Sequence, residues 1–146
     1  MSETFVNKVA ESGIITLDPA NYLPKDNILV FDLKDHLFMG LILKEKDFRE
    51  ALKTHDWEQY RGQHVALTCS ADAIIPVWAY MLVAANLEPV AASVTMGNEQ
   101  DVQKKLYLAN LATIPAQDYT DQRVVIKGCG ETPIPDYVYM ELTRIL

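Results

Sequence analysis

Short apolar runs alternate along the chain with segments of helical spacing, a pattern that predicts an α/β fold. The runs at 64–69 and 123–128 are nearly continuous in apolar residues, as is typical of strands buried on both faces of a sheet. Residues 14–17, 28–33 and 90–96 predict further strands. Because helices separate these strands, we expect a largely parallel or mixed sheet with helices packed on it.

Helical segments flank both of the buried runs. Lys44–His55 and Asn98–Ala112 precede them, and Asn98 is the expected N-cap of the second segment. Another helix follows each run and begins near Pro76 or Pro135, since proline at the first helical position costs no hydrogen bond. The residues expected on the buried stripes of the two preceding helices are Phe48, Ala51 and Leu52, and Val102, Leu106 and Ala109.

The helix–strand–loop–helix pattern occurs twice. A shift of 59 residues aligns 65–87 with 124–146 without a gap, and it places Ile75-Pro76 on Ile134-Pro135. We interpret this as a tandem duplication with copies at about 43–87 and 102–146. The alternative is chance similarity between α/β segments of like composition. The whole chain, 1–146, is predicted to form one domain, whose less regular N-terminal part (1–42) starts with a short helix at 4–12.

Charge and hydropathy exclude several classes of partner. The formal net charge is −7, whereas nucleic acids and anionic membranes require clustered Lys and Arg. No apolar run reaches the length of a membrane span, and the N-terminus lacks the apolar segment of a secretory signal. We therefore expect a cytoplasmic protein without a nucleic-acid or membrane partner. An unpaired sheet edge would allow a homo-oligomer.

Two strand-to-helix loops carry the candidate chemistry. Right-handed crossovers would place both at the C-terminal edge of one sheet, where α/β folds bind ligands. Each loop holds one thiol and one carboxylate. The electric field at a helix N-terminus favours the thiolate form of a cysteine, and the thiolate can act as a metal ligand or as a nucleophile. The alternative is structural, since cysteine often packs in cores and acids stabilise helix starts. The candidate ligand-binding residues are Cys69, Ser70 and Asp72 in one loop, and Cys129, Glu131 and Thr132 in the other.

Cys69 and Cys129 are the candidate metal ligands. His36, which follows Asp32 and Asp35, is a further candidate ligand or base, or else a surface histidine. No Cys-x-x-Cys or His-x-x-x-His spacing supplies a full ligand set. His55 and His64 are assigned no chemical role. Motifs for dinucleotides, nucleoside triphosphates and esterases are absent from the sequence.

Residues 68–81 (Thr-Cys-Ser-Ala-Asp-Ala-Ile-Ile-Pro-Val-Trp-Ala-Tyr-Met) resemble a signature of DUF2480, a bacterial family of unknown function best represented in Bacteroidetes. Segments 40–49 and 124–129 resemble it too, so that the likeness spans almost the whole chain. The family has no established activity, and the resemblance therefore implies no catalytic residues. It does imply a partner in iron–sulfur cluster assembly, because family genes often lie near the genes of that process. Members tend to continue past the position of Leu146 to another cysteine, which implies an incomplete site here if that tail supplies a ligand.

Three functions are consistent with these residues. The first is an accessory protein for metal or iron–sulfur handling, with Cys69 and Cys129 as ligands or sulfur carriers and a metal ion as cofactor. The second is a non-catalytic scaffold, or a domain that binds a small molecule or anion at its helix N-termini. The third is an enzyme with a cysteine nucleophile and His36 as base. All depend on the two thiols lying at the same edge of one sheet.

Overall fold

The computed structural model describes residues 13–128 and 130–146, and the chain divides into two compact units. Unit 1 comprises 1–24 and 105–146, and unit 2 comprises 25–104. Each unit has its own hydrophobic core. The predicted helix at 4–12 and the candidate ligand Cys129 lie outside the described residues.

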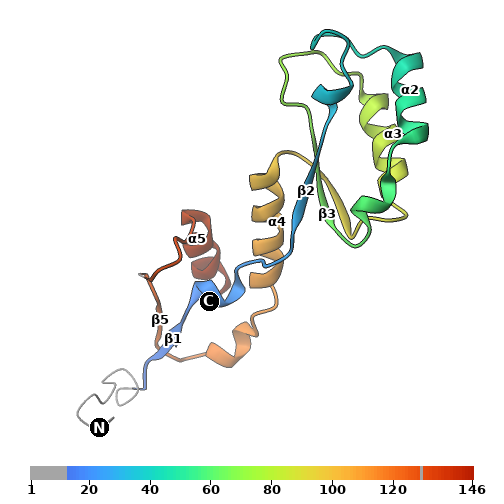
Figure 1. Ribbon diagram of the computed structural model, residues 1–146. Helices are drawn as coiled ribbons and strands as arrows, with labels where there is room; N and C mark the ends of the chain where they lie inside the picture. Colours follow the sequence, from blue (N-terminus) through green and yellow to red (C-terminus); the bar gives the residue numbers. More distant parts are fainter. Residues whose placement is uncertain (1–12, 129) are drawn as a thin grey trace. The chain divides into compact units, whose positions relative to one another are not determined.

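Unit 2 is built on a parallel sheet of three strands in the order β2-β3-β4 (Figure 1). These strands are β2 (Ile28–Asp32), β3 (His64–Thr68) and β4 (Ser93–Met96). The residues at the centre of β3 are buried, as its continuous apolar run predicts for the middle strand of a covered sheet. Helices α2 (Glu45–Thr54) and α3 (Val77–Leu87) belong to the same unit.

The core of unit 2 joins these helices to the sheet. Phe48 and Leu52 on α2 are buried, and so are Val83 and Leu87 on α3. Burying a side chain of this size contributes about 1.5–3 kcal/mol. The packed core fixes the position of the carboxyl ends of β2 and β3. Asp32 is the last residue of β2, and Cys69 and Ser70 directly follow β3.

Unit 1 contains a parallel pair of strands, β1 (Ile15–Leu17) and β5 (Val124–Ile126). Helix α5 (Asp136–Ile145) follows β5, and the unit also includes the part of α4 (Glu99–Leu111) from residue 105 onward. Within the core, the buried Tyr107 hydroxyl donates a hydrogen bond of 2.6 Å to the carbonyl of Pro19. This bond ties α4 to the 3₁₀ turn η1 (Pro19–Tyr22), which starts directly after β1 and Asp18.

The predicted α/β class with parallel pairing is confirmed, but the prediction of a single sheet is wrong. β3 pairs with β2 and β4, whereas β5 pairs with β1 in a separate sheet. Val125 is 45% exposed, and β5 is therefore not buried on both faces as predicted. An apolar run identifies a strand but does not specify its partner, and β5 has only one partner to cover it. The prediction of one domain over 1–146 stays a prediction.

The helix boundaries agree with the sequence to within one or two residues. Pro76 and Pro135 are the N-caps of α3 and α5 rather than their first helical residues. The predicted N-cap of α4 is confirmed, because Asn98 and Asp101 exchange hydrogen bonds of 2.9 Å between side chain and backbone. The buried positions of α4 are Val102, Tyr107 and Leu111, whereas the predicted Leu106 is half-buried and Ala109 is exposed. The bulky Tyr107 side chain takes the interior position instead.

Several elements recur at the spacing of the predicted duplication. The 3₁₀ turn η3 (Trp57–Tyr60) is followed 59 residues later by η4 (Ala116–Tyr119), and α3 is followed by α5 at the same spacing. The buried pair Phe48 and Leu52 corresponds to the buried pair Tyr107 and Leu111. The duplication itself stays a prediction. Within residues 13–128 and 130–146, none of the helices has the length and apolar character needed to span a membrane.

Candidate functional site

The first loop (69–76), between β3 and α3, is held by a carboxylate from the neighbouring strand. Asp32 is the last residue of β2 and pairs in register with Thr68, the last residue of β3. One oxygen of Asp32, Oδ2, accepts a hydrogen bond of 2.6 Å from the Ser70 hydroxyl. Its Oδ1 accepts bonds from the backbone N–H groups of Ser70 at 3.0 Å and Lys34 at 2.9 Å. The loop is thereby fixed at the position that follows Cys69.

These bonds determine the charge state of Asp32. Partial burial alone would raise the pKa of the Asp32 carboxyl. The hydrogen bonds from Ser70 and Lys34, together with the positive charge of Lys34, outweigh this effect, and the pKa lies below its ordinary value. Asp32 is therefore a stable negative charge at the base of the first loop.

Cys69, the residue before Ser70, is half-buried and packs against the core of unit 2. Its thiol donates a bond of 3.7 Å to the carbonyl of Ala71. Burial raises the pKa of Tyr80, on the first turn of α3, and the negative charge of Asp32 adds to this effect. Cys69 and Tyr80 both pack against the hydrophobic core of unit 2. The thiol thus directly precedes Ser70, the residue that Asp32 binds.

Asp72 lies in the first loop, and its carboxylate does not cap α3 through a hydrogen bond among the described residues. Asp72 is exposed, and in the described part of the chain its side chain forms no hydrogen bond or ion pair. The N-cap of α3 is Pro76, without a side-chain capping bond, and the same holds for Pro135 at α5. The alternative that Asp72 and Glu131 stabilise the helix starts through the helix dipole stays a prediction.

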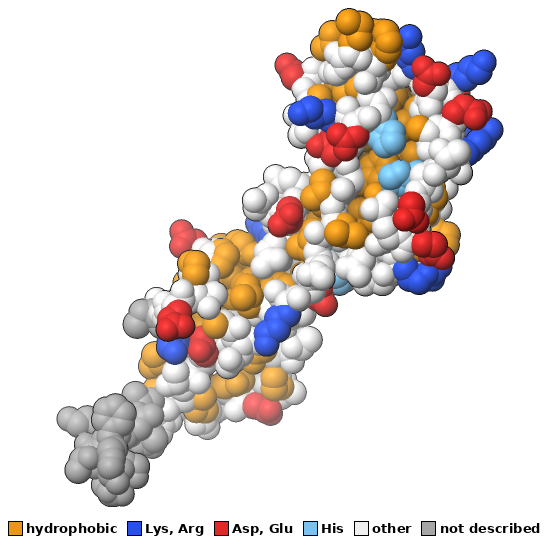
Figure 2. All heavy atoms as spheres, in the orientation of Figure 1, with side chains coloured by type: hydrophobic (Ala, Val, Ile, Leu, Met, Phe, Trp, Pro, Cys, Tyr) orange, Lys and Arg blue, Asp and Glu red, His pale blue; other side chains and the backbone are white. Residues whose placement is uncertain are grey.

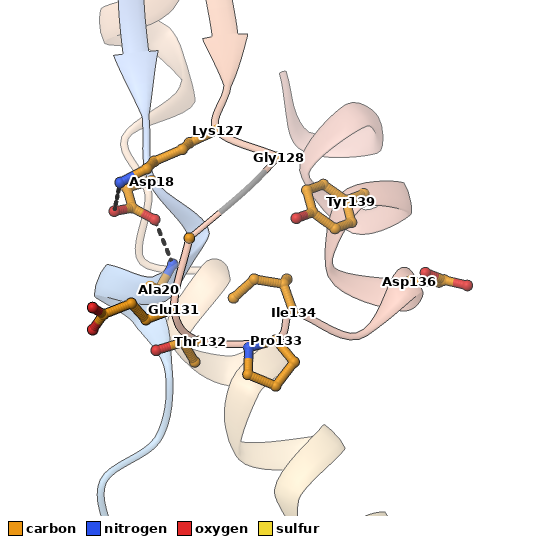
Figure 3. A pocket seen from close by; sticks show the side chains of 11 residues that line it. Asp18, Ala20, Lys127, Gly128, Glu131, Thr132, Pro133, Ile134, Asp136 and Tyr139 are labelled. Carbon is orange, nitrogen blue, oxygen red and sulfur yellow. Dashed lines mark hydrogen bonds and ion pairs between the residues drawn. The ribbon is translucent and has the colours of Figure 1, made fainter.

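The second loop (127–135), between β5 and α5, is anchored in a comparable way by Asp18, which follows β1. Lys127 Nζ lies 3.6 Å from Asp18 Oδ2, and Asp18 Oδ1 accepts a bond of 3.0 Å from the N–H of Ala20. Figure 3 shows this pair on one side of a hollow and Tyr139 of α5 on the other. The hollow has a volume of about 770 Å³ and is lined by Asp18, Ala20, Lys127, Gly128, Gly130, Glu131, Thr132, Pro133, Ile134, Asp136 and Tyr139.

The charges around the hollow bear on its possible ligands. Among the described residues, three carboxylates line the hollow, and the one lining cation, Lys127, is already paired with Asp18. An anion would meet a net negative wall, so the hollow suits a cationic or neutral polar ligand better. Of the predicted site residues, Glu131 and Thr132 line this hollow.

His36 does not join the thiol of Cys69. Its ring stacks on Phe31 at a centroid distance of 5.3 Å and meets Phe48 edge to face at 5.7 Å. Among the described residues, no hydrogen bond or ring contact links it to Cys69. The pKa of His36 is lowered by burial and by neighbouring His55, against the opposing effect of Asp35. The reading of His36 as the base for a Cys69 nucleophile therefore has no contact in its favour.

The lowered pKa of His36 predicts a pH dependence of stability. Between the folded pKa and the ordinary value of 6.5, the unfolded chain binds more protons. The contribution of His36 to the free energy of unfolding is thus complete above pH 6.5, and it is lost as the pH falls through the pKa of the folded state. We expect the free energy of unfolding, from urea titrations at about pH 7.5 and about pH 5.5, to decrease with acidification. His36→Gln should reduce this decrease, and equal slopes in the parent and His36→Gln would contradict the prediction.

Sequence reasoning missed the residues that organise each loop. Asp32 and Asp18 are the anchors, and the available signal was an acidic residue where a strand ends beside β3 or β5. Tyr80 packs against the hydrophobic core of unit 2, as Cys69 does. In the part of the chain that the structure describes, no three His, Cys, Asp or Glu side chains gather closely enough to hold a metal ion. The expected common sheet edge for the two thiols is wrong, because the first loop follows β3 and the second follows β5, which belong to separate sheets. The predicted ligand pair of Cys69 and Cys129 itself stays a prediction.

Comparison with known proteins identifies one family. The family described as "Protein of unknown function (DUF2480)" matches residues 3–146. Neither the curated proteins nor the solved structures contain a match to the chain.

Proposed function

The chain belongs to the DUF2480 family, and we propose that it is an accessory protein that holds a thiophilic metal ion through Cys69, in the service of metal or iron–sulfur handling. Cys129, outside the described residues, is the second thiol of this proposal. Asp72, Glu131 and Thr132 would act as supporting oxygen ligands of their respective loops.

The anchoring of the first loop by Asp32 is the observation that carries this proposal. A ligand must be held in one orientation before the metal arrives, since ordering it afterwards reduces affinity. The two bonds from Ser70 to Asp32 restrict the backbone directly after Cys69. The negative charge of Asp32 also compensates part of the charge of a bound cation. A thiol needed only for packing would require neither feature.

The ligand set of the first loop suits transient holding. Thiolates select soft and borderline metals such as Zn²⁺, Cu(I) and iron in clusters. A single thiol leaves coordination positions open, and a partner's ligands can occupy these. An accessory role, in which the metal passes to another protein, follows from such an open site.

Metal analysis of the full chain tests the proposal. Protein purified without added metal, then incubated with Zn²⁺ or Fe²⁺ and desalted, should retain metal. Cys69→Ser should lose the metal that this thiol holds, and the double variant Cys69→Ser/Cys129→Ser should lose all thiol-dependent metal. Ser replaces the sulfur with little change in shape, and Thr113→Ser is a surface control. Equal metal content in the parent and the double variant would contradict the proposal.

The hollow of unit 1 favours a second candidate, a non-catalytic module that binds a polar small molecule. Its volume of about 770 Å³ lies within the range of ligand pockets. A rise in the melting temperature of the metal-free protein on addition of a small polar cation would favour this second function, provided that Tyr139→Phe or Glu131→Gln reduces the rise.

The cytoplasmic location, a homo-oligomer and a partner in iron–sulfur assembly also stay predictions.

A further inference from the structure

Unit 2 holds a second group of metal-ligating side chains outside the first loop. His36 lies on the 3₁₀ turn η2 (Leu33–His36), and His55 is the C-cap of α2. Their ring centroids are 6.2 Å apart, and the ring planes meet at 73°. Both residues are half-buried. Figure 2 shows two neighbouring histidine side chains that reach the surface between hydrophobic ones. Segments that are distant in sequence thus bring two imidazoles together.

The same aromatic residues hold both rings in place. Phe31 stacks on His36 at 5.3 Å with 7° between the planes, and it meets His55 at 5.3 Å and 70°. The hydroxyl of Tyr60 lies 2.9 Å from His55 Nε2. Histidines that bind metals usually have one ring nitrogen fixed by such a hydrogen bond while the other faces the metal. For His55 this arrangement leaves Nδ1 as the ligand atom.

We propose that His36 and His55 together bind a divalent transition-metal ion whose remaining coordination positions are filled by water. With a metal–nitrogen bond of about 2.0–2.1 Å, each ring centroid lies roughly 3.2 Å from the metal, and the two centroids can be at most about 6.4 Å apart. The observed 6.2 Å lies within this limit. If one ring moved about 1 Å closer to the other, the nitrogen–metal–nitrogen angle would reach the tetrahedral value.

The chemistry of the pair narrows the class of metal. Imidazole suits Cu²⁺, Ni²⁺ and Zn²⁺, and Cu²⁺ binds most tightly in this series. Two protein ligands are consistent with the absence of any group of three His, Cys, Asp or Glu among residues 13–128 and 130–146. The lowered pKa of His36 keeps its imidazole neutral near pH 7, which is the ligating form. The site uses neither thiol and is independent of the proposed function of Cys69.

Titration with Cu²⁺ of the full chain carrying Cys69→Ser/Cys129→Ser tests this site, because that background removes the thiols. The ring of Trp57 lies 4.8 Å from His55, so bound Cu²⁺ should quench its fluorescence. We expect saturable quenching at one equivalent of Cu²⁺. His36→Gln and His55→Gln should each raise the dissociation constant at least about tenfold, since each removes one of two protein ligands.

His64→Gln is the matched control, because His64 is the remaining histidine and its ring contacts Ser93 and Asp26 instead. It should bind Cu²⁺ like the background protein. Circular dichroism verifies that each variant is folded, and Ni²⁺ repeats the titration with an ion that does not change redox state. Equal affinity in all three histidine variants, or quenching that does not saturate, would overturn the proposal. Loss of the thiols cannot produce either result, since every protein in the series lacks them.

Discussion

Replacing Tyr107 with alanine should lower the free energy of unfolding by about 3–5 kcal/mol, among the largest effects for a single substitution in this chain. Tyr107 is fully buried in the core of unit 1. Its ring meets Tyr137 edge to face at 6.2 Å, and its hydroxyl donates to Pro19 at 2.6 Å. The substitution leaves a cavity and also deprives the Pro19 carbonyl of its donor. Both effects destabilise the same core.

Urea unfolding followed by circular dichroism measures this loss. Tyr107→Phe is the matched control, because it removes only the hydroxyl and should cost about 1 kcal/mol. Tyr139→Phe, at the half-buried edge of α5, should cost less than either. An alanine variant within 1 kcal/mol of the parent would show that Tyr107 does not hold η1 against α4.

The same variant tests the prediction that the chain is one domain. Both tryptophans, Trp57 and Trp78, lie in unit 2, whereas Tyr107 lies in unit 1. In a single cooperative domain, transitions measured by different probes coincide. Tyr107→Ala should then shift the tryptophan fluorescence transition as far as the circular dichroism transition. An unshifted fluorescence transition would mean that the two units unfold independently.

Removing the carboxylate of Asp32 should expose the thiol of Cys69. Asp32→Ala eliminates the two hydrogen bonds from Ser70 that fix the first loop and a third from the backbone of Lys34. Hydrogen bonds to a charged acceptor contribute about 1.5–3 kcal/mol each. Asp32 is partly solvated, so a total of about 1–2 kcal/mol is the appropriate scale. Since about 1.4 kcal/mol corresponds to a factor of ten, the opening of the loop should rise roughly tenfold.

The rate of alkylation of Cys69 by iodoacetamide, in a Cys129→Ser background, reports this opening. Asp18→Ala removes the equivalent anchor of the second loop and is the matched control. It should leave the reaction of Cys69 unchanged. Ser70→Ala retains the backbone bond to Asp32 and should have an intermediate effect. An Asp32→Ala variant whose thiol reacts like the parent would remove the structural basis of the proposed site.

The strands and helices could be predicted from the sequence because their signals are local. A continuous apolar run marks β3, and Asn98 with Asp101 marks the start of α4. Strand pairing is not local, since β1 pairs with β5 although more than a hundred residues separate the two strands in the sequence. The apolar pattern of β5 resembles that of β3, although one lies in a pair and the other in the middle of a sheet. The pattern therefore identified each strand but led to a single sheet that does not form.

The candidate site shows the same division between local and non-local information. The loop residues Cys69 and Ser70 could be selected because they follow a strand and precede a helix. Their partner Asp32 lies 38 residues away from Ser70 in the chain, and only the register of β2 with β3 brings the two together. Likewise, His55 carries no local signal that links it to His36. In both cases, a contact with a segment distant in the sequence positions the residue, and the sequence pattern does not predict such contacts.

Titration of the full chain with Co²⁺ under anaerobic conditions tests most directly whether Cys69 is a metal ligand. A thiolate bound to Co²⁺ produces a charge-transfer absorption in the near ultraviolet, which oxygen and nitrogen ligands do not produce. We predict that this absorption appears in the parent and in His36→Gln, and that Cys69→Ser diminishes or abolishes it. An identical spectrum in the parent and Cys69→Ser, or no charge-transfer absorption in the parent, would contradict the proposed function.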